Sequence, residues 1–578
     1  MAKLGAEFHD RFTIFRVWSP FAKSIAVQGD FSDWQDIALE KDSNNIWSKK
    51  VNHVKAGQTY KYKILGFDDN IYYRNDPRAL ALTDSDDGKS VVTDGQFDWE
   101  GLESVDIASK DQQIIYELHL GTFNRPDVAT TGSFASAIER LDYLKSLGVT
   151  TIELMPITSM STSYGWGYAP NAIFSVESLY GGSFGLKNFI KEAHRRGLAV
   201  MLDVIYNHFS NTNDLWNFDG WNENGGGGIY FYNDDRVKTP WGGRPDYGRK
   251  EVRDFILDNV AMWLNDYHVD GFRIDSTIYM RNIYGNNSDP ANDIPDAWRL
   301  MSDITSLVRR IKPDALVIAE DCAGNAMITE DQQNGGAGFD SQWDLGLPHV
   351  IRGALYLPGE PHGLSNLVNV MQQSFSGDWS KRIVFADSHD TAANGGARII
   401  ASAVGETNTN SVSARRIAIL SSAIALTTPG IPMLLAGSEF LQGGDFNEWR
   451  ALIWSNAEKF AGIVEAHRHL IALRANHHGD TAGLASNYLN FLMVDENCRV
   501  LVYQRGEDKQ QPVIVAINFS GLKWKNYNLN LPLGDWRVRF NSSWRGYSKD
   551  FSGIDLDVVN QNSKITLAPH QVLILSKI

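Results

Sequence analysis

Between residues 113 and 437, short apolar runs alternate with amphipathic runs, and this alternation constrains the fold more than any other feature of the chain. The intervening runs, such as 134 to 148 and 184 to 197, carry apolar residues at helical spacing. Strands that alternate with helices pair in parallel through crossover connections. We therefore predict a closed (β/α)8 barrel, with strands at 113 to 120, 149 to 156, 198 to 206, 269 to 275, 315 to 320, 338 to 343, 382 to 387 and 431 to 437.

A doubly wound open sheet would show the same alternation of strands and helices. It is less well supported, because no Gly-rich phosphate-binding turn follows the first predicted strand. The segment from 209 to 247 is rich in Gly, Asn, Asp and aromatic residues, and it is too long for an ordinary connection between a strand and a helix. In a barrel, a loop of this length is expected to shape the functional site.

The chain changes character on both sides of the predicted barrel. From about residue 12 to 101, and again beyond about 480, short alternating runs are broken by turn-forming residues. We expect a multidomain α/β protein with an N-terminal β-sandwich, a central (β/α)8 TIM barrel with the 209–247 insertion, and a C-terminal antiparallel β-sandwich. The predicted boundaries are 1–105, 106–480 and 481–578.

Net charge, cysteine count and the length of the apolar runs indicate which binding partners and which cellular compartment to expect. The net charge of −15 disfavours nucleic acid and fits a neutral polymer better. Two cysteines, Cys322 and Cys498, are too few for a disulfide framework, which favours a reducing compartment. Because the sequence shows neither a signal-peptide core nor an apolar run of membrane-spanning length, we expect a cytoplasmic protein without membrane association.

Three acids follow strand-like runs at the positions where barrel enzymes carry their chemistry. Asp275 ends the run 269 to 275, Glu320 ends 315 to 320, and Asp390 lies shortly after 382 to 387. Burying an acid at the end of an apolar strand is costly unless the acid is paired or functional. Cleaving a glycosidic bond with retention needs one carboxylate as nucleophile and a second carboxyl as acid and then base, about 5 Å apart. The pattern predicts glycosidase chemistry.

These residues belong to four segments that occur in one order. The chain resembles the α-amylase superfamily of glycoside hydrolases and transglycosylases in DVIYNH (203 to 208), GFRIDS (271 to 276), VIAED (317 to 321) and ADSHD (386 to 390). The resemblance implies Asp275 as nucleophile, Glu320 as general acid/base and Asp390 as transition-state stabiliser. We expect Arg273 to keep Asp275 ionised, and partial burial with nearby negative charge to keep Glu320 protonated at first.

The same resemblance implies further substrate-binding residues. It implies that His208 and His389 bind the sugar and that the Tyr168 ring stacks under it. It also implies that Asp203 supports the nucleophile and its arginine. Asn207 stands where many amylases take a calcium ligand, although Asn at a strand end is equally a turn former. No cofactor is expected to be required, and Ca²⁺ is an open alternative.

The resemblance also frames the reaction, because water at the glycosyl-enzyme gives hydrolysis whereas a sugar hydroxyl gives transfer. The front β-sandwich and the region 434 to 454 are similar to branching enzymes, while DVIYNHF and DGFRIDSTIYM are nearer to malto-oligosyltrehalose trehalohydrolases. After the His-Asp pair, branching enzymes usually have Glu and trehalohydrolases Gln, but this chain has Thr391.

We favour a 1,4-α-glucan branching enzyme acting on α-glucan polysaccharide or malto-oligosaccharide. The alternatives are an α-glucan hydrolase and, remotely, a non-catalytic glucan-binding protein. In the long insertion, Trp221, Tyr230 and Tyr232 could serve as sugar platforms or could pack in the interior. The oligomeric state is left open.

Overall fold

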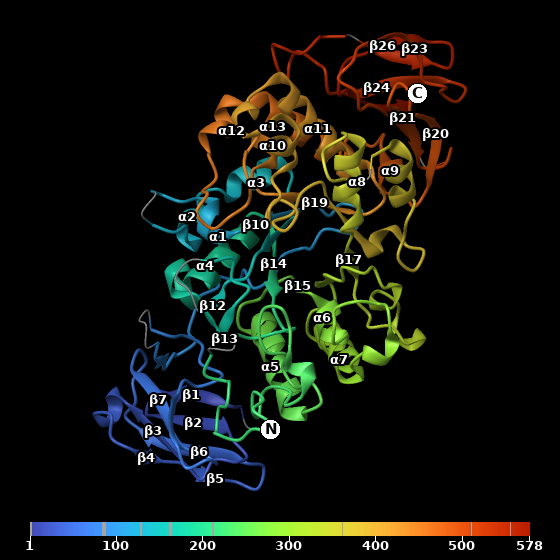
Figure 1. Cartoon of the computed structure of the whole chain (residues 1–578). Coiled ribbons are helices and arrows are strands. Elements are labelled where there is room, and N and C mark those ends of the chain that lie inside the picture. The colour runs from blue at the N-terminus through green and yellow to red at the C-terminus, as the bar shows by residue number, and fades with distance from the viewer. Residues whose placement is uncertain are drawn as a thin grey trace.

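The computed structural model describes residues 3–83, 88–127, 130–160, 165–210, 213–360, 362–509, 511–554 and 556–578. Along the chain, a small β domain, a central α/β barrel and a second β domain follow one another. Figure 1 shows the two β domains at opposite ends of the molecule, with the barrel between them. The three-part architecture predicted from the sequence is therefore confirmed.

The N-terminal β domain consists of two antiparallel sheets. One sheet has the order β1 (Gly5–His9), β2 (Phe12–Trp18), β6 (Ile46–Asn52) and β5 (Glu40–Lys41). The other has the order β4 (Ile37–Ala38), β3 (Ser24–Gly29), β7 (Thr59–Leu65) and β8 (Ile71–Arg74), with β9 (Ser90–Val91) also pairing with β7. Every second residue of β2 and β7 is buried, as expected for strands with one face on a core, and these residues include Phe15, Tyr60 and Tyr62.

The central region is a closed barrel of parallel strands. In order around the barrel these are β10 (Ile115–Leu118), β11 (Thr151–Leu154), β14 (Ala199–Val204), β15 (Gly271–Ile274), β16 (Leu316–Ala319), β17 (Ser341–Trp343), β18 (Arg382–Val384) and β19 (Ile431–Leu435), which pairs with β10. Each strand lies inside its predicted range. These strands are buried along their whole length, which explains why they read as continuous apolar runs rather than as alternating ones.

Helices surround the barrel, and one of them differs from the prediction. The helix expected at 134 to 148 is two helices, α2 (Phe134–Ile138) and α3 (Leu141–Leu147). The chain bends at Arg140, whose Nε donates to Asn124 and whose guanidinium lies 4.4 Å from the Trp454 ring, so tertiary contacts override the helical pattern. The others are α1 (Leu120–Phe123), α4 (Gly182–Arg195), α5 (Lys250–Asn265), α6 (Thr277–Arg281), α7 (Pro295–Ile311), α8 (Gly346–Ala354), α9 (Leu364–Met371), α10 (Ile399–Val404), α11 (Val412–Thr427), α12 (Ser455–Lys459) and α13 (Ala461–Arg474).

The C-terminal region is an antiparallel β domain with its own core. Its main sheet has the order β20 (Leu489–Asp495), β21 (Val500–Arg505), β22 (Val513–Asn518), β27 (Val572–Lys577), β24 (Asp535–Asn541) and β25 (Val558–Asn560). A second pair, β23 (Trp524–Asn528) and β26 (Lys564–Leu567), contributes Leu567 to a cluster around the buried Trp536. On the barrel side, the Tyr503 hydroxyl lies 2.6 Å from that of Thr427 on α11.

The long insertion from 209 to 247 connects the barrel to the N-terminal domain; residues 211 and 212 lie outside the described part. A short hairpin, β12 (Thr158–Met160) and β13 (Pro170–Val176), precedes it. The Oδ2 atom of Asp219 accepts hydrogen bonds from the Phe21 amide at 3.0 Å and from the Ser19 hydroxyl at 3.2 Å. Arg74 donates to the carbonyl of Asn217 at 2.9 Å.

Across the described ranges, no helix has the length and apolar composition needed to cross a membrane.

We predict that Asp219→Ala weakens the attachment of the N-terminal domain. The change leaves the Phe21 amide and the Ser19 hydroxyl without their buried acceptor, which should cost about 1–3 kcal/mol of unfolding free energy. Urea unfolding measures the loss. Asp234→Ala is the control, since Asp234 lies in the same insertion with a half-exposed side chain. Equal midpoints for both variants would contradict the assignment.

Candidate active site

The predicted catalytic acids lie at one end of the barrel. Asp275 and Glu320 directly follow β15 and β16, which are neighbouring strands, and Asp390 lies in the loop after β18. The carboxyl ends of parallel strands meet at one edge of a barrel, so these side chains share a site. Gly271 lets the two strands approach closely, because a Cβ atom there would lie 2.5 Å from the carbonyl oxygen of Leu316.

Arg273 is the centre of this site and links three acids. Its Nη1 donates to both oxygens of Asp203, at 2.8 and 2.7 Å, and to Oδ1 of Asp275 at 2.8 Å. Its Nη2 donates to Oε2 of Glu320 at 2.7 Å, and the Trp343 ring lies 4.5 Å from the guanidinium carbon. One fully buried guanidinium therefore bridges the two carboxyls predicted to carry the reaction.

Acidic groups outnumber basic ones around Arg273, because three carboxyls bind one guanidinium. Burial lowers the pKa of Arg273, but Asp203 and Glu320 outweigh it and raise that pKa well above its ordinary value. Burial raises the pKa of Asp203 to about 7, even though Arg273 acts in the opposite direction and Asp275 adds a further increase. Asp203 thus keeps its proton to a higher pH than an ordinary aspartate does.

Ser276 orients Glu320 through strained backbone. It has φ 39° and ψ 55°, a left-handed conformation that non-glycine residues rarely adopt. In this conformation its amide donates to Oε2 of Glu320 at 2.9 Å. The Cys322 thiol donates to the other oxygen, Oε1, at 3.4 Å. Strained backbone of this kind concentrates at functional sites, where the surrounding structure over-determines it.

His389 forms a second buried pair beside the first group. Its Nδ1 lies 2.5 Å from Oε1 of Glu117 on β10, and its amide donates to Oε2 of the same residue at 3.0 Å. The Tyr168 ring stacks on the imidazole with centroids 5.2 Å apart, and the Tyr168 hydroxyl donates to Asp203 at 2.5 Å. Tyr168 therefore connects the His389–Glu117 pair to the acids around Arg273.

Asn207 and His208 lie on the other side of the nucleophile candidate. The Asn207 amide donates to Oδ2 of Asp275 at 2.5 Å and to its carbonyl at 2.9 Å. His208 Nε2 lies 2.8 Å from the carbonyl of Tyr168, and its Nδ1 binds Asn207 Oδ1. The Asn207 oxygen lies against His208 Nδ1, and calcium binding at Asn207 stays a prediction. No group of three or more His, Cys, Asp or Glu in the described part of the chain could hold a metal.

Asp390 differs from the other two acids in its exposure. Its side chain is 36% exposed, and Oδ1 lies 3.4 Å from Nε2 of His389. The neighbouring Thr391 hydroxyl accepts from the Ser388 amide at 2.8 Å, so it closes its own turn. Asp390 is therefore the acid of the three that remains accessible to a bound sugar.

Sequence reasoning missed Glu117, which holds His389. It named Asn207 as a calcium ligand or a turn former, but not for its direct contact with Asp275. The signal for Glu117 was present, because it is a charged residue inside the apolar run 113 to 120, the same argument that singled out the catalytic acids. Glu153 on β11 carries the same signal, and within the described residues its two buried carboxyl oxygens have no hydrogen-bond partner.

The aromatic residues of the insertion divide into packed and exposed ones. Tyr230 and Tyr232 are buried, and Trp221 stacks on Phe21 of the N-terminal domain at 4.5 Å, so all three serve packing rather than a sugar platform. Trp241, which sequence reasoning did not single out, is 53% exposed, and its ring centroid lies 5.6 Å from that of His208. It is the insertion's aromatic beside the candidate site.

Comparisons with known proteins agree with this geometry. Residues 118–238 match the family described as alpha amylase, catalytic domain, and residues 3–79 match carbohydrate-binding module 48 (isoamylase N-terminal domain). The chain is similar to 1,4-alpha-glucan branching enzymes of Fusobacterium nucleatum, with 26% identity over 94% of this chain and 89% of that protein, and of Bacillus cereus strain 03BB102, with 26% identity over 99% and 91%.

Solved structures share the fold. The catalytic module of the pneumococcal glycogen-degrading virulence factor SpuA has a TM-score of 0.79 at 18% identity, covering 100% of this chain and 97% of that one. A pullulanase from Anoxybacillus sp. LM18-11 has a TM-score of 0.77 at 20% identity, covering 100% and 87%. With the four ordered segments and the acids of the barrel edge, the chain belongs to the α-amylase superfamily of glycoside hydrolases and transglycosylases.

Proposed function

We propose that this protein is a 1,4-α-glucan branching enzyme, which cuts an α-1,4 link and rejoins the released chain at a 6-hydroxyl. The observation that carries the proposal is the similarity to branching enzymes over 94% to 99% of the chain. That similarity includes the N-terminal domain, which matches a carbohydrate-binding module. The substrate would be an α-glucan polysaccharide or a malto-oligosaccharide. We keep the cytoplasmic location and the absence of a required cofactor as parts of the proposal.

In this proposal Asp275 attacks the anomeric carbon, and Glu320 first protonates the leaving oxygen and then deprotonates the acceptor. Their common bond to Arg273 supports these roles, because the two nitrogens of one guanidinium hold the two carboxyls side by side, and retention requires a close spacing, about 5 Å, between its two carboxyls. Asp390, which is accessible, would bind ring hydroxyls as the transition state forms. Asn207 would hold Asp275 in place for attack.

Hydrolysis of α-glucans is the second candidate. It is favoured by Thr391, since the resemblance to branching enzymes leads us to expect Glu at this position. A threonine hydroxyl that closes its own turn offers the acceptor less than a carboxylate would. The same glycosyl-enzyme would then be resolved by water, as in trehalohydrolases and amylases.

The proposed site has an aromatic surface at Trp241. Its ring is half exposed and lies beside His208, and the Tyr279 ring supports it edge-on with centroids 5.0 Å apart. A tryptophan held from one side and open on the other can stack on the apolar face of a sugar ring. We assign Trp241 to substrate binding outside the bond that is cleaved.

The protonation of His389 depends on its buried partners. Burial lowers the pKa of His389, but Asp390 and Glu117 together outweigh this and raise it to about 9, with Arg273 opposing them. A charged imidazole would donate to a sugar oxygen near Asp390. Because the folded-state pKa exceeds the ordinary value, the stability that His389 contributes is fully present below about pH 6.5 and is lost as the pH rises through 9.

Asp275→Asn should reduce turnover of amylose by about 10⁴-fold or more, because the amide cannot attack the anomeric carbon. Proton NMR of the products follows α-1,6 signals and reducing ends together. Branching predicts that the unmodified enzyme builds α-1,6 signals at a constant number of glycosidic bonds. Asp254→Asn, on the exposed face of α5, is the control and should keep full activity. Reducing ends without α-1,6 signals would establish the hydrolase instead.

Trp241→Ala should raise KM for a malto-oligosaccharide about 3- to 10-fold and leave kcat nearly unchanged, since stacking contributes to binding in the ground state and transition state alike. Steady-state kinetics separates the two constants. Trp544→Ala removes a similarly exposed tryptophan from the C-terminal domain and serves as the control. A fall in kcat at constant KM would contradict the assignment.

Between pH 6.5 and 9, the protein should lose up to roughly 3 kcal/mol of unfolding free energy through His389. Asp203, whose pKa is raised from 3.8 to about 7, contributes a separate loss of unfolding free energy. This loss begins as the pH rises above 3.8 and is complete near pH 7. Urea unfolding at several pH values measures both windows. In Glu117→Gln the upper window should shift to lower pH, because one of the two acids that raise the His389 pKa is removed. An unchanged upper window in this variant would show that Glu117 does not hold the histidine charge.

A further inference from the structure

Arg398 is a buried arginine that the proposed reaction does not use. It lies immediately before α10, is 3% exposed, and its Nε and Nη1 atoms have no hydrogen-bond partner among the described residues. An arginine keeps its charge in proteins, and burying a charge without a partner is very costly. The guanidinium therefore requires a ligand or water that occupies the neighbouring space.

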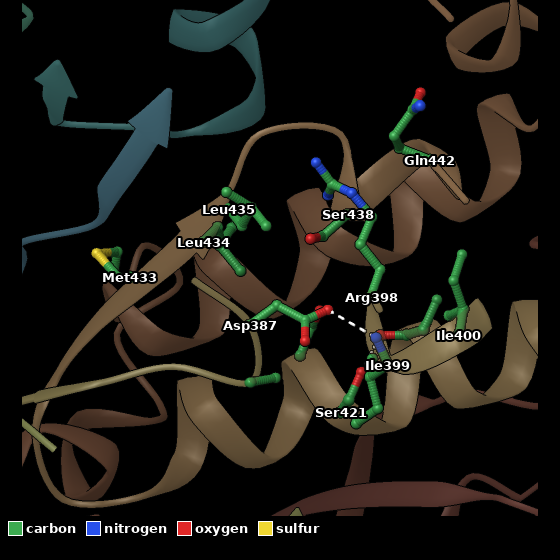
Figure 2. Close-up of a pocket in the computed structure, with 13 residues that line it drawn as sticks. Asp387, Arg398, Ile399, Ile400, Ser421, Met433, Leu434, Leu435, Ser438 and Gln442 are labelled. Carbon is green, nitrogen blue, oxygen red and sulfur yellow. Dashed lines mark hydrogen bonds between the residues drawn. The ribbon is translucent and has the colours of Figure 1, made fainter. Parts of the chain in front are cut away.

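That space is a small internal cavity beside β19 and α11. Its volume is about 20 Å³, and its lining includes Arg398, Asp387, Ser438 and Gln442. Figure 2 shows the Arg398 side chain extending toward Ser438, whereas the Asp387 carboxylate turns to the backbone of Ile399. A second cavity of about 10 Å³ also has Arg398, Leu435 and Gln442 in its lining.

The nearby acids leave the charge of Arg398 uncompensated. Asp387 is engaged by Arg352, with Nη2 and Oδ1 2.5 Å apart, and by the Ile399 amide at 3.0 Å. Glu439 accepts from the Tyr116 and Tyr143 hydroxyls at 2.9 and 3.0 Å. Burial raises the pKa of Glu439, which favours its neutral form. Asp387 therefore faces two arginines, and Glu117, which also acts on Arg398, is paired with His389, so a positive charge remains.

We propose that the cavity at Arg398 binds one small monovalent anion of halide size. Nε and Nη1 of Arg398 would hold the ion, and the polar side chains of Ser438 and Gln442 line the same space. Because a single water needs roughly 10–15 Å³, a cavity of about 20 Å³ takes one such ion and excludes a phosphate or a sugar ring.

This anion site is separate from the arginine group of the candidate active site. Both terminal nitrogens of Arg273 are paired with Asp203, Asp275 and Glu320, whereas the cavity at Arg398 lies against β19, α10 and α11. The second cavity is lined by Phe446, whose ring centroid lies 6.1 Å from that of His389. The proposal does not depend on which glycosyl transfer the enzyme performs.

Thermal unfolding of the full chain tests the site. At constant ionic strength, replacing sodium gluconate by sodium bromide should raise Tm by about 2 °C or more, and the rise should saturate, because the ion binds only the folded protein. Arg398→Met should lose this response. Arg299→Met removes an exposed arginine from α7 and should keep it. A bromide response that is equal in all three proteins would overturn the proposal.

Crystals grown in bromide give a second measurement on the unmodified protein, which decides the question if Arg398→Met fails to fold. We expect an anomalous peak within hydrogen-bonding distance of Nε or Nη1 of Arg398. Ordered water at this position, without anomalous signal, would show that the cavity is hydrated and would overturn the anion site.

Discussion

The buried charge of Arg273 is the constraint on which the rest of the site depends. A guanidinium without solvent requires acids within hydrogen-bonding distance, and the barrel supplies them from three neighbouring strands, through Asp203, Asp275 and Glu320. Removing the arginine would leave three buried carboxyls without their common cation. The arginine that these acids satisfy also brings Asp275 and Glu320, the two carboxyls of the proposed reaction, together, so stability and the proposed chemistry depend on the same contacts.

His389 and Glu117 form a second buried pair in which a charged group is held by a partner of opposite charge. Tyr168 connects this pair to the acids around Arg273, because its ring stacks on the imidazole while its hydroxyl binds Asp203. Groups held by several fixed contacts need little reorganisation when charge develops on a bound sugar. The aromatic and ionic contacts together form a rigid wall around the bond to be cleaved.

The sequence predicted a site residue where its immediate neighbours in the chain already indicated its role. Strands buried on both faces read as apolar runs, and an acid such as Glu320 at the end of one was evident. Glu117 was not singled out because its partner, His389, lies 272 positions away in the chain. The helix break near Arg140 has a similar cause, since Trp454 and Asn124 approach it only in the folded protein. Trp221 and Trp241 each stand beside a glycine in the insertion, and the contacts of Trp221 with Phe21 and Arg249 arise only in the folded protein.

The fate of the glycosyl-enzyme rests on a part of the molecule that is distinct from its charged centre. Both water and a sugar hydroxyl would meet the same Asp275 and Glu320, so the choice between them falls to surfaces that bind the acceptor. Trp241 lies in the insertion that also anchors the N-terminal domain through Asp219. A domain that stabilises this insertion therefore steadies the aromatic surface on which an acceptor chain would rest. If the protein acts as proposed, the N-terminal domain would influence transfer through the insertion, without touching the reacting bond.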